Sequence, residues 1–254
     1  MQTKTQSKEF KDLIFGIHPV LEAIESGQEV NKILILRSEQ NENLSKIVRQ
    51  ARQKNIIVQR VPQEKLNRVT RKNHQGVIAF LSPITYDILD EILPRLFEEG
   101  KNPLIIVLDG VTDVRNMGAI CRSAECMGAH AIVLPSKGGA LINSDAVKTS
   151  AGAVFNLSIC KVDELKDALN LIKQSGLQII ACTEKGDRTL SEGQFSNPTA
   201  VLLGAEDTGI KHQLIKLADQ QLRIPMSGKT LSLNVAVSAG VVLYECSRQR
   251  LQIK

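Results

Sequence analysis

Hydrophobic residues in the first third of the chain fall into short apolar runs and into helical spacings, and the two kinds alternate. An apolar run bounded by polar residues predicts a buried strand, while apolar residues three or four positions apart predict an amphipathic helix. The predicted strands are 32–36, 56–58 and 75–81. The predicted helices follow Pro19 and span 41–54 and 62–69. This order predicts a small α/β/α sandwich over residues 13–83, after a polar segment at 1–12 that we expect to be a disordered lead-in.

A second alternation starts at Leu104 and runs towards the end of the chain. Its predicted strands are 104–108, 131–134, 156–160, 177–181 and 200–203. Its predicted helices are 115–128, 162–175, 212–218 and 233–248. Strands that alternate with helices predict a mostly parallel sheet covered on both faces. Residues 84–103 are predicted to form a polar connecting helix and hinge, bounded by Gly100 and Pro103, between two domains.

The composition fits a soluble globular protein of 254 residues, with 43% hydrophobic and 23% charged residues. No apolar run approaches the ~20 residues that span a membrane, and the first residues lack the apolar core of a signal peptide. We therefore expect a cytoplasmic protein without membrane association. The five cysteines are scattered, and their odd number excludes a complete disulfide framework within one chain. No metal is expected, although Cys121, Cys126 and His130 leave a zinc site as an alternative with unfavourable spacing.

Positive charge is concentrated in one segment rather than spread along the chain. Residues 44–75 contain nine Lys or Arg residues and one acid, Glu64, whereas the whole chain carries a net charge of +5. A cluster of one sign within a folded domain favours a polyanionic partner such as RNA. The candidate RNA-binding residues are Arg49, Arg52, Arg68, Arg71 and Lys72. A solvated face on two helices is the alternative. Aromatic residues make up only 3% of the chain, so phosphate contacts should outweigh base stacking.

The segment 223–230 ends like a phosphate-binding P-loop but does not begin like one. Gly228, Lys229 and Thr230 satisfy the end of G-x-x-x-x-G-K-[ST], whereas Arg223 stands where the first glycine is required. Without that glycine the backbone cannot readily wrap a phosphate. A P-loop nucleotide hydrolase remains as an alternative class. The Rossmann fingerprint G-x-G-x-x-G is also missing after the strand at 104–108, where the chain reads DGVTD.

Three separate stretches carry the strongest functional signal. They read LDGVTDVRNMGAICR at 108–122, VLLGAEDTGI at 201–210 and RIPMSGKTLSLNVAVSAGVVLYE at 223–245. In this order they resemble the motifs of the SpoU (TrmH) branch of the SPOUT RNA 2′-O-methyltransferases, and the resemblance covers nearly the whole chain. It implies a catalytic domain at 104–254, a Rossmann-like parallel sheet with a trefoil knot that holds S-adenosylmethionine (SAM). It also implies that residues 13–83 form an RNA-binding domain resembling a ribosomal protein, and that the protein is a homodimer through the knot domain.

The resemblance implies roles for individual residues. The implied catalytic residues are Asn116, Arg122, Glu206, Ser232 and Asn234. The implied SAM-binding residues are Leu203, Gly204, Ile224, Met226 and Leu233. Arg122 would lie beside the ribose 2′-hydroxyl, but a guanidinium is effectively always protonated. We therefore expect Arg122 to orient the phosphate and the hydroxyl and to assist deprotonation. Taken singly, each of these residues has an ordinary alternative role as a helix cap, a solvated charge or a packing residue.

The expected function is SAM-dependent methylation of a ribose 2′-hydroxyl in RNA. A guanosine in 23S rRNA is the favoured substrate, because the implied N-terminal RNA-binding domain favours the rRNA enzymes over the shorter tRNA type. Other members of this branch share that domain. A tRNA guanosine 2′-O-methyltransferase and a non-catalytic RNA-binding ribosome-assembly protein remain alternatives.

Overall fold

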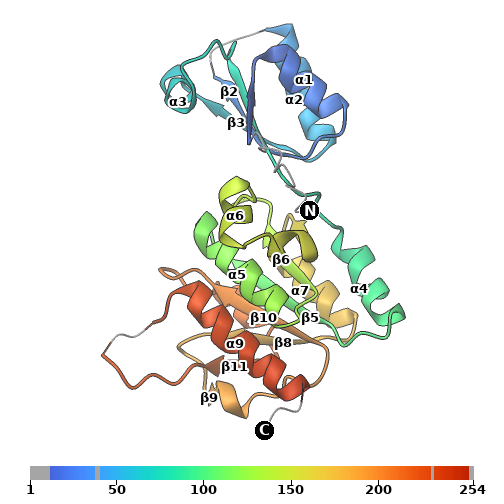
Figure 1. Cartoon of the computed structure of the whole chain (residues 1–254), viewed down its shortest axis with the longest axis vertical. Helices are drawn as coiled ribbons and strands as arrows, with labels where there is room; N and C mark the ends of the chain where they lie inside the picture. Colours follow the sequence, from blue (N-terminus) through green and yellow to red (C-terminus); the bar gives the residue numbers. More distant parts are fainter. Residues whose placement is uncertain (1–11, 38–40, 230–231, 252–254) are drawn as a thin grey trace, which may run out of the picture. The chain divides into compact units, whose positions relative to one another are not determined.

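The computed structural model describes residues 12–37, 41–229 and 232–251, which form two compact units (Figure 1). The first unit contains the residues up to Ile84 together with Ile142–Ser144. The second contains Thr85–Leu141 and the residues from Asp145 onward. The lead-in predicted at 1–12 lies outside the described residues apart from Asp12.

The first unit is built on a four-stranded sheet in the order β1-β4-β2-β3. The strands are β1 (Leu13–Phe15), β2 (Val30–Leu36), β3 (Ile57–Val61) and β4 (Val77–Leu81). β2 and β3 pair in parallel, and β4 pairs antiparallel with both β1 and β2. The apolar runs predict three of these strands. β1 escapes prediction because its three residues are too few to show a period.

Helices cover both faces of this sheet, which confirms the predicted α/β/α sandwich. The helices are α1 (Ile17–Glu25), α2 (Glu42–Gln53) and α3 (Gln63–Val69). Ile24 of α1 and Ile47 of α2 pack with Ile33 of β2 on one face. Leu66 of α3 packs with Leu34 of β2 on the opposite face. Alternate residues of a strand point to opposite faces, so β2 contributes to two separate cores.

The second unit contains a seven-stranded parallel sheet in the order β7-β6-β5-β10-β8-β11-β9. The strands are β5 (Leu104–Asp109), β6 (Ala131–Pro135), β7 (Ser158–Val162), β8 (Gln178–Cys182), β9 (Arg188–Thr189), β10 (Thr199–Gly204) and β11 (Gln220–Arg223). All six residues of β5 are buried. The central strands therefore read as continuous apolar runs, as expected for a parallel sheet covered on both faces. The trefoil knot stays a prediction.

Helices pack on both faces of the second sheet. They are α4 (Leu89–Glu98), α5 (Val114–Cys126), α6 (Ser144–Thr149), α7 (Leu165–Gln174), α8 (His212–Ile215) and α9 (Val235–Arg250), with 3₁₀ turns at Ala153–Asn156 and Leu190–Glu192. α4, α7 and α8 share a core with one face of the sheet. α5 and α9 lie side by side against the other face (Figure 1). In the part of the chain that the structure describes, no helix is both long and apolar enough to cross a membrane.

The segment predicted to be a connecting helix and hinge at 84–103 contains the helix α4 (Leu89–Glu98). Leu89, Ile92, Leu93 and Leu96 of α4 are buried in the core of the second unit. The backbone of Asp87, just before this helix, forms an isolated parallel β-bridge with Cys160 of β7. Because its apolar face is buried, α4 belongs to the second unit as a packed element.

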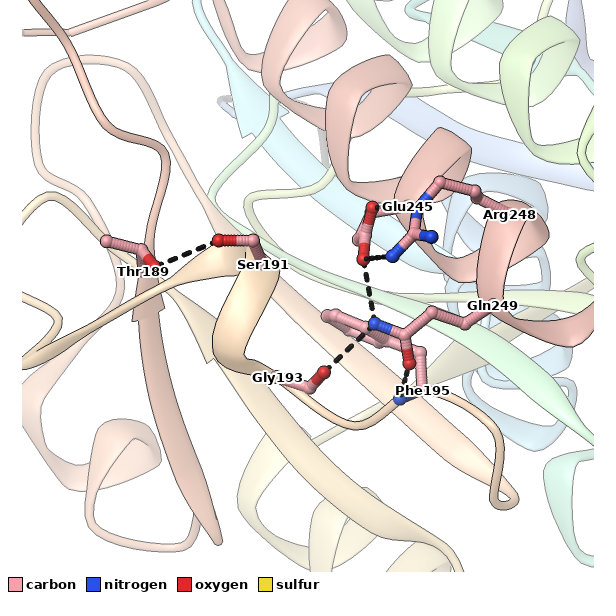
Figure 2. Close-up of polar contacts among 7 residues, drawn as sticks. All are labelled: Thr189, Ser191, Gly193, Phe195, Glu245, Arg248 and Gln249. Carbon is pink, nitrogen blue, oxygen red and sulfur yellow. Dashed lines mark hydrogen bonds and ion pairs between the residues drawn. The ribbon is translucent and has the colours of Figure 1, made fainter. Parts of the chain in front are cut away.

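Side-chain hydrogen bonds fix the end of α9 to the loop that follows the 3₁₀ turn at Leu190–Glu192 (Figure 2). Gln249 donates to the carbonyl of Gly193 over 3.0 Å and accepts from the amide of Phe195 over 2.8 Å. Glu245 accepts from Gln249 over 2.7 Å and from the Arg248 guanidinium over 2.7 and 2.8 Å. These bonds hold the C-terminal half of the helix whose first turn reaches the candidate site.

Candidate active site

The carboxyl ends of β5 and β10 lie next to each other near the centre of the second sheet. The register pairs Asp109, the last residue of β5, with Gly204, the last residue of β10. From β5 the strand order continues through β6 and β7 on one side, while β10 and β8 lie on the other. Ligands of open parallel sheets bind outside the carboxyl ends of the strands, where the strand order reverses. The topology alone therefore marks this edge as a binding site.

A cavity of about 620 Å³ opens at this edge, between the loops that follow β8, β10 and β11. Its lining includes all the residues expected to bind SAM, Leu203, Gly204, Ile224, Met226 and Leu233. Ser232, expected to be catalytic, lines the cavity as well. Thr183 and Lys185 in the loop after β8 also line it, and nothing in the sequence pointed to them. A loop after a short strand gives no periodic signal, which explains why they were missed.

Gly204 allows the loop after β10 to turn back tightly on the strand. A Cβ atom added at Gly204 would lie 2.2 Å from the carbonyl carbon of Gly209 and 2.3 Å from the nitrogen of Ile210. Gly209 itself has a φ of +65°, and its amide donates to the carbonyl of Ala205 over 2.9 Å. Only glycine fits at position 204 without displacing backbone, and that backbone forms one wall of the cavity.

Asp109 anchors the far end of the same loop. Its side chain is buried, and Oδ2 accepts from the backbone amide of Lys211 over 2.8 Å. The Lys211 ammonium lies 3.0 Å from Oδ1 and is itself largely exposed. A buried carboxylate of this kind is stabilised by a backbone donor together with a cation.

One hydrogen-bonded cluster joins all three sequence motifs. The amide nitrogen of Asn116 donates to Oε1 of Glu206 over 3.2 Å. The amide nitrogen of Asn234 donates to Oδ1 of Asn116 over 3.1 Å and also contacts the same oxygen of Glu206. The backbone amide of Val235 donates to that oxygen over 3.1 Å. Glu206 therefore ties the loop after β10 to the first turns of α5 and α9.

The two helices that meet at this cluster are both capped there. Asp113 accepts from the amides of Arg115 and Asn116 at the start of α5, each over 2.8 Å. The side-chain oxygen of Asn234 accepts from the amides of Ala236 and Val237 at the start of α9. The positive ends of two helix dipoles therefore lie at this cluster, where they favour the negative charge of Glu206.

Arg122 belongs neither to the cavity lining nor to the hydrogen-bonded cluster. It is exposed on α5, six positions after Asn116, and it is not among the residues that line the cavity. It forms no hydrogen bond or ion pair with any residue of the described chain. A single copy of the chain thus brings together Asn116, Glu206, Ser232 and Asn234 but leaves Arg122 on the surface.

Family models match both units of the chain. Residues 103–244 match the model of the SpoU rRNA Methylase family, a stretch that includes the cavity and the polar cluster. The chain belongs to the SpoU rRNA methylase family. Residues 13–87 match a second model, described as the substrate-binding domain of RNA 2′-O ribose methyltransferases.

Individual relatives of this SpoU protein agree with the family assignment. An uncharacterized tRNA/rRNA methyltransferase of Synechocystis is 33% identical over 96% of this chain, and the match spans 64% of that relative. The 23S rRNA (guanosine-2′-O-)-methyltransferase RlmB of Yersinia pestis is 32% identical over 94% of this chain and 98% of its own length. Among solved structures, the SpoU methyltransferase AviRb of Streptomyces viridochromogenes with AdoMet (SAM) superposes with a TM-score of 0.60 at 28% identity. That match covers 94% of this chain and 90% of AviRb.

The zinc and P-loop alternatives gain no support from the geometry. Cys121 is fully buried, and burial raises the pKa of its thiol to about 12, which disfavours the thiolate that zinc requires. Within the described ranges, no group of three His, Cys, Asp or Glu side chains is placed to hold a metal ion. Arg223, which replaces the first P-loop glycine, donates to the carbonyls of Gly186 and Asp187 over 2.7 and 2.9 Å. Thr230 lies outside the described residues.

The candidate RNA-binding residues divide between the two faces of the first sheet. Arg49 and Arg52 lie on α2. Arg68 lies on α3, and Arg71 and Lys72 follow it in the loop that leads to β4. α2 and α3 pack on opposite faces of the sheet. The single cluster that the sequence shows is therefore two surfaces in the fold.

Proposed function

We propose that the protein transfers a methyl group from SAM to the 2′-hydroxyl of a ribose in RNA, as its SpoU family membership indicates. The observation that carries the proposal is the cluster of Asn116, Glu206 and Asn234 at the edge that bears the cavity. Two amides and a carboxylate held rigidly by one another, beside two helix starts, can orient a ribose and its flanking phosphate.

The cavity fits SAM in size and in chemistry. Its volume of about 620 Å³ lies within the usual range for small-ligand sites, roughly 300–1,000 Å³. Leu203, Ile224 and Leu233 supply apolar wall for the adenine, and the glycine at 204 lets the backbone approach closely. When bound, SAM supplies an electrophilic methyl group. The relative AviRb holds AdoMet in its solved structure, which supports the same cofactor here.

We also propose that the active protein is a homodimer that docks through α9. Val237, Val241 and Tyr244 of this helix are 51, 37 and 56% exposed, and their spacing of four and three residues places them on one stripe. α5, which carries the exposed Arg122, packs beside α9. A second copy seated on this stripe would lie next to Arg122, so that Arg122 of one copy can serve the cavity of the other. Ser232, which lines the cavity, is available to a phosphate in the same site.

Subunit mixing tests this arrangement. An Arg122→Ala protein and an Asn116→Ala protein are each expected to be inactive in methyl transfer. Mixed dimers should regain activity, because one of their two sites receives an intact Arg122 and an intact Asn116. If mixtures stay inactive while heterodimers form, Arg122 acts within its own subunit or not at all.

For the substrate, we propose a guanosine of 23S rRNA, supported by the full-length similarity to RlmB of Yersinia pestis. The name of the Synechocystis relative leaves tRNA open, so tRNA is the second candidate. Both assignments place the protein in the cytoplasm. The test is incorporation of labelled methyl groups from SAM into unmodified 23S rRNA and, separately, unmodified tRNA. Labelling of tRNA alone would refute the rRNA assignment, and SAM and RNA binding without any labelling would favour a non-catalytic assembly protein.

A further inference from the structure

The two faces of the first sheet differ in charge. The face covered by α1 and α2 carries a smaller excess of positive charge, because Glu22, Glu25 and Glu42 lie among its cations, which are Lys46, Arg49, Arg52, Lys54 and Arg60. Lys46 forms an ion pair with Glu25 over 3.0 Å, and Lys54 donates to the carbonyl at the end of α1. Lys46 and Lys54 are therefore already engaged within the protein.

The face covered by α3 carries an excess of positive charge. Its cations are Lys32, Lys65, Arg68, Arg71 and Lys72, and Glu64 is the acid among them. Within the described chain none of these cations forms an ion pair. Instead, Lys32 lies 4.7 Å from the centre of the Phe80 ring and Lys72 lies 5.9 Å from that of Phe15. Burial, together with the charge of Lys65, lowers the pKa of Lys32, so this charge is poorly compensated. An anion bound on this face would relieve the repulsion.

A hollow of about 600 Å³ opens on the same side, at the C-terminal end of α3. It is lined by Glu64, Asn67, Arg68, Val69, Thr70 and Arg71. The lining thus combines two guanidinium groups, a carboxylate, an amide, a hydroxyl and an apolar side chain. Guanidinium groups suit phosphate, and the remaining groups suit the edge and the flat face of a base.

The wall of the hollow is held in place by a buried histidine. The amide of Gly76 donates to Nδ1 of His74 over 3.1 Å, so a neutral His74 carries its proton on Nε2. Nε2 then donates to Oδ1 of Asn67 over 3.0 Å. This bond fixes the Asn67 side chain and leaves its NH₂ group free to donate into the hollow. The backbone amide of Lys72 donates to Thr70 Oγ1 over 3.3 Å, which shapes the loop that carries Arg71.

We propose that the hollow beside α3 receives an unpaired RNA nucleotide, with its flanking phosphates on Arg68 and Arg71; this rests on the proposed function, because it assumes an RNA substrate. An A-form duplex keeps its bases stacked and its major-groove edges in a deep, narrow groove, whereas an unpaired base can enter a hollow and be contacted on its face and edge. The α3 face therefore selects RNA with a loop or a bulge, and the α2 face contributes less to binding.

The test compares matched pairs of substitutions on the two faces in the full-length protein. Arg68→Ala/Arg71→Ala alters the α3 face, and Arg49→Ala/Arg52→Ala removes the same charge from the α2 face. The probes are a hairpin RNA with an unpaired loop and a fully paired duplex with the same number of phosphates. Binding is measured by fluorescence anisotropy over a range of salt concentrations. Arg68→Lys/Arg71→Lys keeps the charge but not the fork of donors, so it should restore only part of the affinity.

Wild type should bind the hairpin more tightly than the duplex. The α3 pair should weaken hairpin binding about tenfold or more and lower the salt slope by about 1.4, the loss of two contacts at ~0.7 each on single strands. The α2 pair should cause a smaller loss. Equal losses from both pairs, or equal binding of hairpin and duplex by wild type, would overturn the inference. Methyl transfer measured on the same wild-type protein separates the two proposals, since a wild type that transfers no methyl group contradicts the proposed function alone.

Discussion

The substitution Gly204→Ala tests the geometry of the candidate cofactor site most sharply. An added Cβ would meet three backbone atoms of residues 209 and 210 at 2.2, 2.3 and 2.4 Å. No side-chain rotation can relieve these overlaps. Favourable contacts between carbon atoms lie near ~3.5–4.0 Å, so the loop must retreat by about 1 Å or more. That loop forms one wall of the cavity.

The magnitude follows from the displaced backbone. Overpacking of this kind costs about 1–3 kcal/mol, and for a chain of this size each kcal/mol lowers the melting temperature by about 2–4 °C. A retreating loop also loses hydrogen bonds to a bound ligand, each worth about 1 kcal/mol. Because 1.4 kcal/mol corresponds to a tenfold change, we expect the Kd for SAM to rise about tenfold or more.

Isothermal titration calorimetry with SAM measures the affinity, and thermal unfolding measures the stability. Gly228→Ala is the matched control, because Gly228 lines the same cavity but an added Cβ there meets no atom within 4 Å. The control should change the Kd far less than Gly204→Ala does. If Gly204→Ala binds SAM as wild type does, the loop after β10 does not form the cofactor wall.

Four further substitutions extend the account. Arg122→Ala should abolish methyl transfer while leaving the Kd for SAM within about threefold, because Arg122 does not line the cavity; normal turnover would refute its role. Asp109→Ala should lower the free energy of unfolding, measured in urea, by about 1.5–3 kcal/mol, which is the usual value of a hydrogen bond to a charged group. An unchanged free energy of unfolding would show that the bond from Lys211 to Asp109 does not stabilise the loop. Tyr244→Glu should convert dimer to monomer in light scattering, whereas Ile88→Glu, which alters an equally exposed residue, should not. Burial lowers the pKa of His130, so wild-type stability should fall as the pH drops below ~6.5, because the unfolded chain binds the proton more readily. His130→Gln should flatten this pH dependence of stability. An unchanged dependence in the variant would show that another group causes it.

Much of the fold followed from the pattern of apolar residues. The strand at 104–108 and its neighbours β6 and β10 were predictable because all but one of their residues are buried, and a buried strand reads as an unbroken apolar run. β1 and β9 were not predictable, since three and two residues carry no period and are ordered by their neighbours. The packing of α4 into the second unit was not predictable, because its exposed face is charged and its apolar stripe has only four buried residues.

The candidate site was predictable from motifs but not from physics alone. No rule of periodicity brings Asn116, Glu206 and Asn234 together, because their contact depends on the order of strands in the sheet. The anchor at Asp109 became visible only when Lys211 was seen to donate to it. The split of the basic segment between two faces likewise needed the fold, since adjacent helices in sequence pack on opposite sides of one sheet.

The most direct test of the central claim is the identity of the methylated nucleoside. Unmodified RNA is incubated with the wild-type protein and SAM, digested to nucleosides and examined by mass spectrometry. The account predicts a methyl group on the ribose, as 2′-O-methylguanosine. A methyl group on a base, or no methylated nucleoside from a protein that binds both SAM and RNA, would contradict it.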